Sequence, residues 1–379
     1  MDRTELAAWL RLLLTPGIGA GTARKLLQAF GPPAQLFAQS AQALGALLSP
    51  AQVEALGAVP SDLATHTART EDWLQADPAG RRLLTLADPL YPQQLLQLDD
   101  APLLLFAMGM AEAWAADWLN QPDNVCLAMV GSRNPSAQGL ANAQQFAHSL
   151  AGAGLCIVSG MALGIDGASH EGALQGARAD ALATIAVVGT GLDRVYPRQH
   201  RVLAHRIAQR GLLLSEFALG TAPLATNFPR RNRIIAGLAR GTLVVEAALQ
   251  SGSLITAQMA ADQGREVFAI PGSIHAPQAR GCHALIKQGA KLVETAQDVL
   301  DELQWPGLLP PAQPAIAIAD TAPHSALLTA LGHDPQSLDS LQARCGLPTA
   351  TLLAQLMELE LQGHVARLPG GLFQRVAQA

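Results

Sequence analysis

The chain has 379 residues, of which 49% are apolar and 15% are charged, and its formal net charge is −5 at pH 7. This length is sufficient for two or three domains around a large core. No apolar run reaches membrane-spanning length and residues 1–5 lack a signal-peptide pattern, so we expect a cytoplasmic protein without membrane contacts. The mildly acidic balance disfavours indiscriminate nucleic-acid binding and leaves room for one focused basic site.

The N-terminal part, residues 1–75, is rich in Ala and Leu with helical periodicity, which predicts a helical domain. Its residues 14–27 resemble a helix-hairpin-helix of the SAM-like kind, with a Gly-Ile-Gly turn at residues 17–19. Two interpretations of this turn stay open. Its N–H groups bind a phosphate with help from Arg24 and Lys25, or the hairpin serves packing alone.

Residues 81–303 predict an α/β domain with a doubly wound, Rossmann-like parallel sheet. Short continuous apolar runs, typical of strands buried on both faces, alternate with helical segments of roughly ten to fifteen residues. Two of these runs contain Cys126 and Cys156, which we expect to be core thiols. The predicted strands are Val125–Met129, Leu155–Val158, Thr184–Val188, Leu212–Leu214, Leu243–Val245 and Val267–Ile270.

The C-terminal part begins with a Pro/Ala-rich stretch, residues 304–323, which we expect to be a linker. Residues 324–379 predict a winged-helix domain with helices near 325–331, 337–345 and 349–362 and a β-wing turn at 369–371. Its third helix carries Glu358 and Glu360 and no cation, although a DNA-reading helix needs cations. We therefore expect this domain to contact protein.

Every predicted strand of the central domain ends in Gly, Ser or a charged residue, and several of these turns open directly into a helix. Parallel strands bring their carboxyl ends to one edge, where ligands bind in such sheets. Small residues let the backbone approach a ligand, while hydroxyl groups and helix-terminal N–H groups bind phosphate oxygens. The pattern predicts an anion-binding rim.

A local island of positive charge lies at residues 228–233, Phe-Pro-Arg-Arg-Asn-Arg, on a turn that we expect to open an apolar helix. No carboxylate occurs between Glu216 and Glu246, yet four arginines do: Arg230, Arg231, Arg233 and Arg240. Arginine is the side chain suited to bidentate phosphate contacts. Taken alone, the segment fits a solvated helix start with surface arginines better than a phosphate site.

Several other site types are disfavoured by their motifs. There is no Walker-type phosphate loop, and Arg194 occupies the third glycine position of a dinucleotide fingerprint. The cysteines and His170, His200 and His205 lack metal-ligand spacing, so we expect neither metal nor cofactor. A triad of Ser159, Asp166 and His170 stays open, although no nucleophile elbow surrounds that serine.

Taken in order, these segments resemble the DprA/Smf (DNA processing) family across almost the whole chain. The motifs that carry the resemblance are residues 130–133 (VGSR), 159–166 (SGMALGID) with His170, 186–191 (AVVGTG) with 196–197 (YP), 228–235 (FPRRNRII), 245–247 (VEA), 251–257 (SGSLITA), 271–272 (PG) and 285–290 (LIKQGA).

The resemblance implies an extended Rossmann-like domain that forms homodimers, binds and protects single-stranded DNA, and loads the RecA recombinase onto it during natural transformation. Single-strand-binding protein is a further candidate partner. Related Rossmann-like hydrolases use a glutamate after a similar turn, but residues 250–259 contain none. We therefore expect a binding protein that is not an enzyme. The alternatives are a nucleotide-processing hydrolase on this fold and an oligomeric scaffold.

The residues expected to bind DNA combine cations with neutral donors. Phe228 is either a stacking face or a core plug. The acids Asp166, Glu216 and Glu246 would anchor arginines or cap helices. Arg231 and Arg233 rank first among the cations and Arg230 is a rim contact. The complete expected set is Ser132, Arg133, Ser159, Gly160, Phe228, Arg230, Arg231, Asn232, Arg233, Ser251, Gly252, Ser253 and Lys287.

Overall fold

The computed structural model describes residues 1–306, 325–332, 335–368 and 370–375, with only the backbone of Ser325. The expected linker, residues 304–323, lies outside the described residues from 307 onward. Within the described ranges, no helix has the length and apolar character needed to cross a membrane.

The N-terminal region is helical, as predicted, and Leu10, Leu12 and Leu26 are fully buried in its core. Gly17 sits between the first two helices with φ +76°, a left-handed conformation that favours glycine. The helices are α1 (Arg3–Leu14), α2 (Ala20–Phe30), α3 (Pro33–Phe37), α4 (Ala41–Gly45), α5 (Pro50–Gly57) and α6 (Leu63–Ala76).

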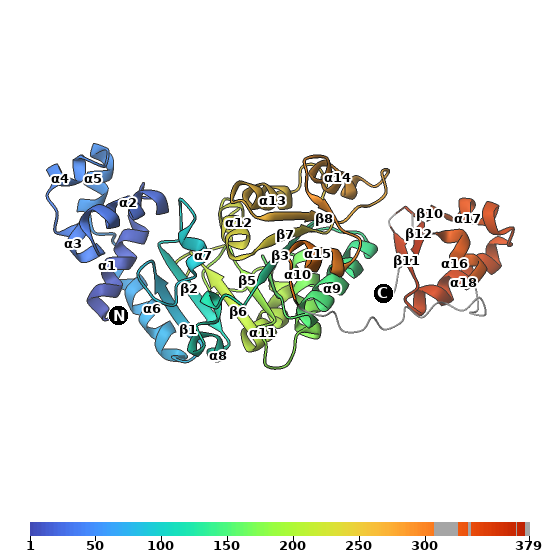
Figure 1. The fold of residues 1–379 in the computed structure, drawn as a ribbon, viewed down its shortest axis with the longest axis horizontal. Coiled ribbons are helices and arrows are strands. Elements are labelled where there is room, and N and C mark those ends of the chain that lie inside the picture. Colours follow the sequence, from blue (N-terminus) through green and yellow to red (C-terminus); the bar gives the residue numbers. More distant parts are fainter. Residues whose placement is uncertain (307–324, 333–334, 369, 376–379) are drawn as a thin grey trace.

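A nine-stranded sheet runs through the middle of the molecule in the order β1-β2-β6-β5-β4-β3-β7-β8-β9 (Figure 1). All six predicted strands are confirmed within two residues. They pair in parallel and are β3 (Cys126–Val130), β4 (Cys156–Ser159), β5 (Thr184–Val187), β6 (Gly211–Ser215), β7 (Gly241–Val244) and β8 (Glu266–Ala269).

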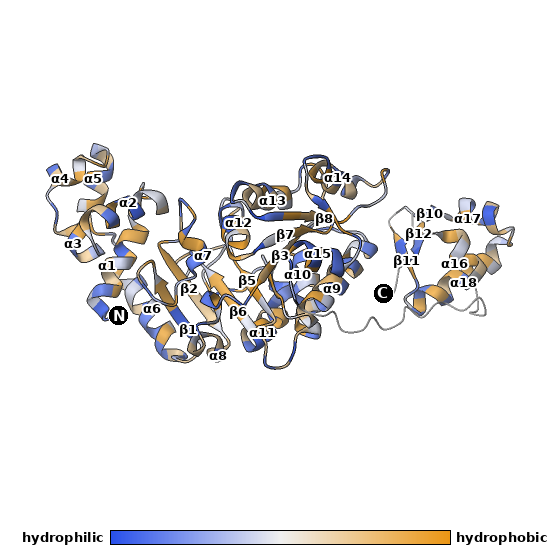
Figure 2. Ribbon diagram, in the orientation of Figure 1, coloured by the Kyte–Doolittle hydropathy of each residue, from blue (hydrophilic) through white to orange (hydrophobic). Residues whose placement is uncertain are grey.

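Three further strands were not predicted. Two of them, β1 (Arg81–Thr85) and β2 (Leu104–Gly109), extend one edge of the sheet in antiparallel pairing, with β2 next to β6. The third, β9 (Lys291–Leu292), is parallel to β8 at the opposite edge. The strands are predominantly apolar, whereas the helices alternate between apolar and polar residues (Figure 2).

Alternate side chains of each strand face opposite helical layers, as the two-residue period of a strand requires. Cys126, Ala128 and Val130 pack with one layer, and Leu127 and Met129 with the other. The first layer contains α7 (Gln93–Leu96), α8 (Ala111–Ala115), α12 (Asn227–Leu238), α13 (Gly252–Asp262) and α14 (Arg280–Lys287). The second contains α9 (Ala137–Gly152), α10 (Ile165–Gly176), α11 (Arg201–Arg210) and α15 (Ala296–Glu302). Single 3-10 turns are η1 (Trp118–Asn120), η2 (Arg198–His200) and η3 (Pro277–Ala279).

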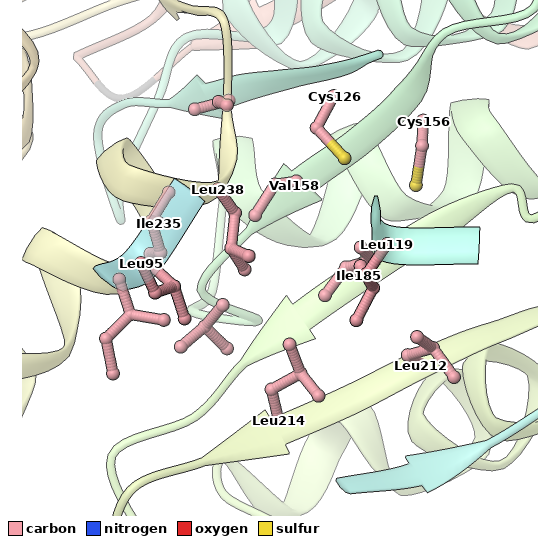
Figure 3. Close-up of a cluster of buried hydrophobic side chains, with 14 of the residues drawn as sticks. Leu95, Leu119, Cys126, Cys156, Val158, Ile185, Leu212, Leu214, Ile235 and Leu238 are labelled. Atoms are coloured by element: carbon pink, nitrogen blue, oxygen red, sulfur yellow. The ribbon is translucent and has the colours of Figure 1, made fainter. Parts of the chain in front are cut away.

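Two cysteines lie side by side in this core. Cys126 and Cys156 are register partners on β3 and β4, and both are buried as free thiols among Val158, Ile185 and Leu212 (Figure 3). Burial raises the pKa of the Cys156 thiol well above its ordinary value. The prediction that these residues are core thiols is confirmed.

The chain order makes the carboxyl ends of β3 and β7 the switch point of the sheet. From β3 the chain builds β4, β5 and β6 to one side, and then crosses back through α12 to place β7 on the other side of β3. Helices that leave the two strands in opposite directions open a crevice between them, which is where doubly wound sheets bind ligands.

The C-terminal region has the winged-helix elements that were predicted, packed around Leu341, Leu352 and Phe373. The predicted wing turn at residues 369–371 lies outside the described residues at position 369. The elements are α16 (Ser325–Leu331), β10 (Gln336–Ser337), α17 (Leu338–Cys345), α18 (Thr349–Leu361), β11 (Val365–Leu368) and β12 (Leu372–Arg375), and the strand order is β10-β12-β11.

Candidate nucleic-acid interface

A groove of about 790 Å³ lies at the switch point of the sheet. Its walls come from the turn after β3, the start of α12 and the start of α13. Eight of the thirteen expected residues meet here, although they are up to 121 positions apart in the chain: Ser132, Arg133, Phe228, Arg231, Asn232, Ser251, Gly252 and Ser253.

Arg133 and Phe228 form one wall of the groove. Arg133 is exposed after β3, and its guanidinium lies over the Phe228 ring, 5.4 Å from the centroid. The Phe228 ring is half-buried and lines the groove, so it is a wall residue rather than a core plug. A cation beside an accessible ring offers both a phosphate contact and a stacking surface.

Tyr196 completes the aromatic wall, and we did not predict it as a site residue. Its ring lies 5.6 Å from that of Phe228 at an interplanar angle of 36°, and the residue is 45% exposed. A smaller pocket of about 160 Å³ opens next to these rings. The chain has only two tyrosines. One of them lies five residues after Gly191, in the loop that follows a glycine-rich strand end, and this position was a signal that could have identified it.

The opposite wall is the N-terminus of α13. Ser251 caps this helix, because its Oγ accepts from the Ser253 N–H at 3.3 Å and lies 2.6 Å from the Ser253 Oγ. Gly252 is exposed, and a Cβ there would meet no atom within 4 Å. The N–H groups of Ser253 and Leu254 donate to the side chain and the carbonyl of Ser251, so it is the N–H of Gly252, in the groove lining, that can donate to an anion.

The carboxylates next to the groove have internal partners, as predicted. Glu246 caps α9 by accepting from the backbone N–H of Ser136 at 2.8 Å and from its hydroxyl at 2.7 Å. Asp166 accepts from the N–H groups of Gly160 and Ala162. Burial raises the pKa of Asp166, and the Arg231 charge and these N–H donors oppose that rise.

Arg231 differs from what we expected of it. The residue is only 4% exposed, and its guanidinium donates to the carbonyls of Gly160, at 2.5 Å, and Val187. Asp166 lies 3.8 Å away as its ion-pair partner. Burial lowers the pKa of Arg231 to about 10. Its main role is therefore to hold α12 against the ends of β4 and β5, and only its edge borders the groove.

Gly160 is required by this contact. A Cβ at this position would overlap the Arg231 guanidinium, so glycine alone lets the arginine approach the strand end. The Gly160 N–H already binds Asp166, and the residue lines the smaller pocket rather than the groove.

Arg233 also points away from the groove. It is 7% exposed and pairs with Glu216 at 2.5 Å and with Asp100 at 2.9 Å, beside a separate cavity of about 330 Å³.

Arg230 is the exposed member of the three arginines, with its guanidinium 5.6 Å from the centroid of the Phe217 ring. The expected ranking of these arginines is therefore wrong, because the two placed first are the buried ones. The segment itself lies within α12 rather than on a turn before it.

Ser159 and Lys287 also fall outside the groove. The Ser159 hydroxyl is fully buried and donates to the Met129 carbonyl at 2.6 Å. Lys287 is exposed at the end of α14, the helix that runs back from the carboxyl ends of the strands towards the start of β9. It therefore lies at the opposite end of the sheet from the groove.

Ser159, Asp166 and His170 do not form a triad, since each binds other partners. His170 is fully buried on α10, and its Nδ1 lies 2.7 Å from the Thr184 hydroxyl. That hydroxyl donates its only hydrogen to the Ile157 carbonyl, so it must accept from Nδ1–H. Burial lowers the pKa of His170 to about 3, which keeps the ring neutral.

The helix-hairpin-helix is attached to the central region through the segment at residues 98–102. Arg24 donates to the Leu98 carbonyl at 2.6 Å, and Lys25 stays exposed. In the same segment Asp100 binds Arg233, and the Pro102 carbonyl accepts from the Tyr91 hydroxyl at 2.8 Å. One of the two cations expected near the turn is thus used in packing.

Fold and groove together define a Rossmann-like protein with a groove at its switch point and a winged helix at its C-terminus. Residues 82–304 match the family model of DNA recombination-mediator protein A, and residues 310–371 match that of the DprA winged helix domain. The chain belongs to the DprA/Smf family.

Two relatives and two solved structures illustrate the similarity. The chain is 43% identical to Protein Smf of Escherichia coli, over 79% of this chain and 78% of that protein. It is 47% identical to DNA processing protein DprA of Streptococcus pneumoniae, over 58% and 74% respectively. The crystal structure of the Streptococcus pneumoniae DprA superposes with a TM-score of 0.60 and 37% identity, covering 78% of this chain and 97% of that one. A structure of Helicobacter pylori DprA, described for its single-stranded DNA binding mode, gives a TM-score of 0.50 and 29% identity over 59% and 96%.

Replacing Arg231 should destabilise the fold, whereas replacing its neighbour should not. Arg231→Ala leaves Asp166 as an uncompensated buried charge, which typically costs about 3–5 kcal/mol of unfolding free energy. Arg230→Ala removes an exposed side chain and should change stability by less than about 0.5 kcal/mol. Urea denaturation of both variants measures the difference. Equal midpoints would contradict the structural role of Arg231.

Protonation of His170 should make stability fall on acidification. The folded pKa, about 3, lies below the ordinary value of 6.5, so the folded chain binds the proton less tightly. This contribution is complete above about pH 6.5 and is lost as the pH falls towards 3. It amounts to about 2 kcal/mol between pH 7 and pH 5.

Urea denaturation at both pH values tests this expectation. His170→Gln should lose about 2 kcal/mol of the pH-dependent change, while the exposed control His205→Gln should retain it. An unchanged pH dependence in His170→Gln would refute it.

Proposed function

We propose that this protein binds single-stranded DNA in the groove, protects it, and loads the RecA recombinase onto it during natural transformation, without catalysing a reaction. The observation that carries the proposal is the pairing of an exposed cation with accessible rings at one wall. Arg133 supplies the cation, Phe228 and Tyr196 supply the rings, and the Ser251-capped helix end faces them.

This chemistry fits a single strand better than a duplex. Unpaired bases can stack on aromatic side chains, whereas the bases of a duplex already stack on each other. Phosphates of the same strand would then reach Arg133 and the Gly252 N–H at the start of α13, with Arg230 at the rim. The solved Helicobacter pylori relative is described as a single-stranded DNA binder, which supports the same ligand for this chain.

A binding role also agrees with the state of the nearby carboxylates. Asp166 faces Arg231 and two backbone N–H groups, and Glu246 caps α9. Both acids are held by internal partners, so neither is poised to activate a water molecule. We further propose that the central domain, residues 81–303, forms a homodimer and that single-strand-binding protein is a partner.

Single-residue variants in the groove should weaken DNA binding in two distinct ways. Arg133→Ala removes one phosphate contact and should reduce the slope of log K against log salt by about 0.7. Phe228→Ala removes a stacking ring and should cost about 1–3 kcal/mol, which is about 5- to 150-fold in Kd. Fluorescence anisotropy with labelled oligo-dT over a range of salt concentrations measures both.

The matched control is Arg178→Ala, which removes an arginine whose side chain is 76% exposed and lies beyond the far end of α10. Its salt dependence should equal that of the unchanged protein. If Arg178→Ala loses affinity for the oligonucleotide while Arg133→Ala and Phe228→Ala do not, the groove is not the binding site. A shallow salt dependence in the unchanged protein, with tight mononucleotide binding, would favour the nucleotide-hydrolase alternative.

RecA loading is tested on DNA covered by single-strand-binding protein. The unchanged protein should shorten the lag of RecA filament formation, measured by RecA-dependent ATP hydrolysis. Arg133→Ala should shorten it less at protein concentrations below the Kd of the variant, because loading requires occupancy of the strand, and Arg178→Ala should act normally. If strand binding is intact but the lag does not change, the loading part of the proposal fails while DNA binding stands.

A further inference from the structure

The loop that joins β6 to α12, residues 216–226, contributes to the groove and continues beyond it. Its residues Pro223 and Ala225 line the groove, and so does Tyr196 from the loop after β5. The first part of the same loop, residues 217–221, is a turn that contacts the N-terminal helical region and lies outside the groove lining. This turn therefore borders the groove from outside.

Two exposed arginines reach this turn from different helices. Arg69 of α6 donates to the Leu219 carbonyl at 3.4 Å. A Cβ on Gly220 would overlap its guanidinium, and Gly220 has φ +89°, so both the backbone and the approach of Arg69 require glycine here. The guanidinium of Arg230, in the first turn of α12, lies 5.6 Å from the centroid of the Phe217 ring. Both cations thus lie on the surface of one short turn.

A third exposed arginine, Arg194, comes from the loop after β5. It directly follows Asp193, whose carboxylate accepts from the Gly220 N–H at 2.8 Å. This hydrogen bond joins the loop to the turn. Arg194 also stands two residues before Tyr196, so it connects the turn with the aromatic wall of the groove.

The charges of the three arginines are available to a ligand. Among the described residues, no carboxylate lies within ion-pair distance of Arg69, Arg194 or Arg230. Of the two acids next to the turn, Glu216 is buried in an ion pair of its own, and Asp193 is held by the hydrogen bond just described. Single exposed arginines are ordinary, but three that meet beside a groove from separate segments form a positive patch.

We infer that Arg69, Arg194 and Arg230 form a second phosphate-binding patch, which holds the backbone of single-stranded DNA where the strand leaves the groove past Tyr196. Arginine binds phosphate oxygens through its planar fork of donors, and this contact is independent of base sequence. The N-terminal helical region takes part in strand binding through Arg69. The inference rests on the proposed DNA binding in the groove.

Two lengths of labelled oligo-dT separate the patch from the groove. One probe has about 4 nucleotides, for the groove by itself, and the other has about 16, enough to extend over the patch. In the variant Arg69→Gln/Arg194→Gln, glutamine keeps a donor for the Leu219 carbonyl and removes the charge. Its slope of log K against log salt should fall by about 1.4 for the long probe, because two phosphate contacts are lost, and should stay unchanged for the short one.

The matched control is Arg3→Gln/Arg178→Gln, which also removes one charge from the N-terminal region and one from the central region. These side chains are 69% and 76% exposed and pair with Glu71 and Asp180. The slopes of the control should equal those of the unchanged protein. The variant Arg69→Lys/Arg194→Lys keeps both charges and should retain the slope for the long probe. Urea denaturation should give the same midpoint for the glutamine variant and the unchanged protein.

Several results would overturn the inference. If the glutamine variant binds the long probe with an unchanged slope while Arg133→Ala weakens both probes, the groove binds DNA and the patch does not. If the glutamine variant weakens both probes equally, the two arginines act by shaping the groove. If the lysine variant behaves like the glutamine variant, the hydrogen bond of Arg69 matters and its charge does not. If the unchanged protein binds neither probe, the proposed function fails as well.

Discussion

The buried guanidinium of Arg231 is the contact on which the architecture of the groove depends. It joins α12 to the carboxyl ends of β4 and β5 through the Gly160 and Val187 carbonyls, with Asp166 as its counter-charge. A buried charge is costly unless it is paired and hydrogen-bonded. These contacts therefore fix where α12 packs against the sheet. Phe228, three residues earlier in the same helix, is thereby brought to the groove wall, beside the ring of Tyr196. The aromatic wall is thus positioned by a charge that solvent hardly reaches.

The arginines of α12 divide into structural and exposed ones. Two of them, Arg231 and Arg233, are neutralised by buried acids, and Arg230 remains exposed. The groove therefore relies on a small number of cations together with backbone N–H groups and aromatic rings. A strand held in this way is gripped through its bases and its phosphates together, as in other sequence-tolerant single-strand binders. An overall acidic chain can do this without a broad basic surface.

Much of the fold could be predicted, because six strands of the parallel sheet are continuous apolar runs and their ends carry the groove residues. The antiparallel edge strands β1 and β2 could not, since they precede the alternating pattern. Which arginine is buried was equally hidden: Arg230, Arg231 and Arg233 are chemically identical, and only their direction on α12 separates them. Lys287 was misplaced for a related reason, because a motif does not tell which end of a helix meets the groove. Burial of Ser159 depends on the Met129 carbonyl of the next strand, a contact between residues 30 positions apart.

The segment at residues 98–102 is held at every second residue by a different part of the molecule: Arg24 at Leu98, Arg233 at Asp100 and Tyr91 at Pro102. Two of these contacts use main-chain carbonyls, which every residue type possesses. Substitutions at positions 98 and 102 therefore leave these two carbonyl acceptors in place. A single inserted or deleted residue would shift the segment out of register with Arg24, Arg233 and Tyr91. In the evolution of this protein, the length of the segment should vary less than its composition.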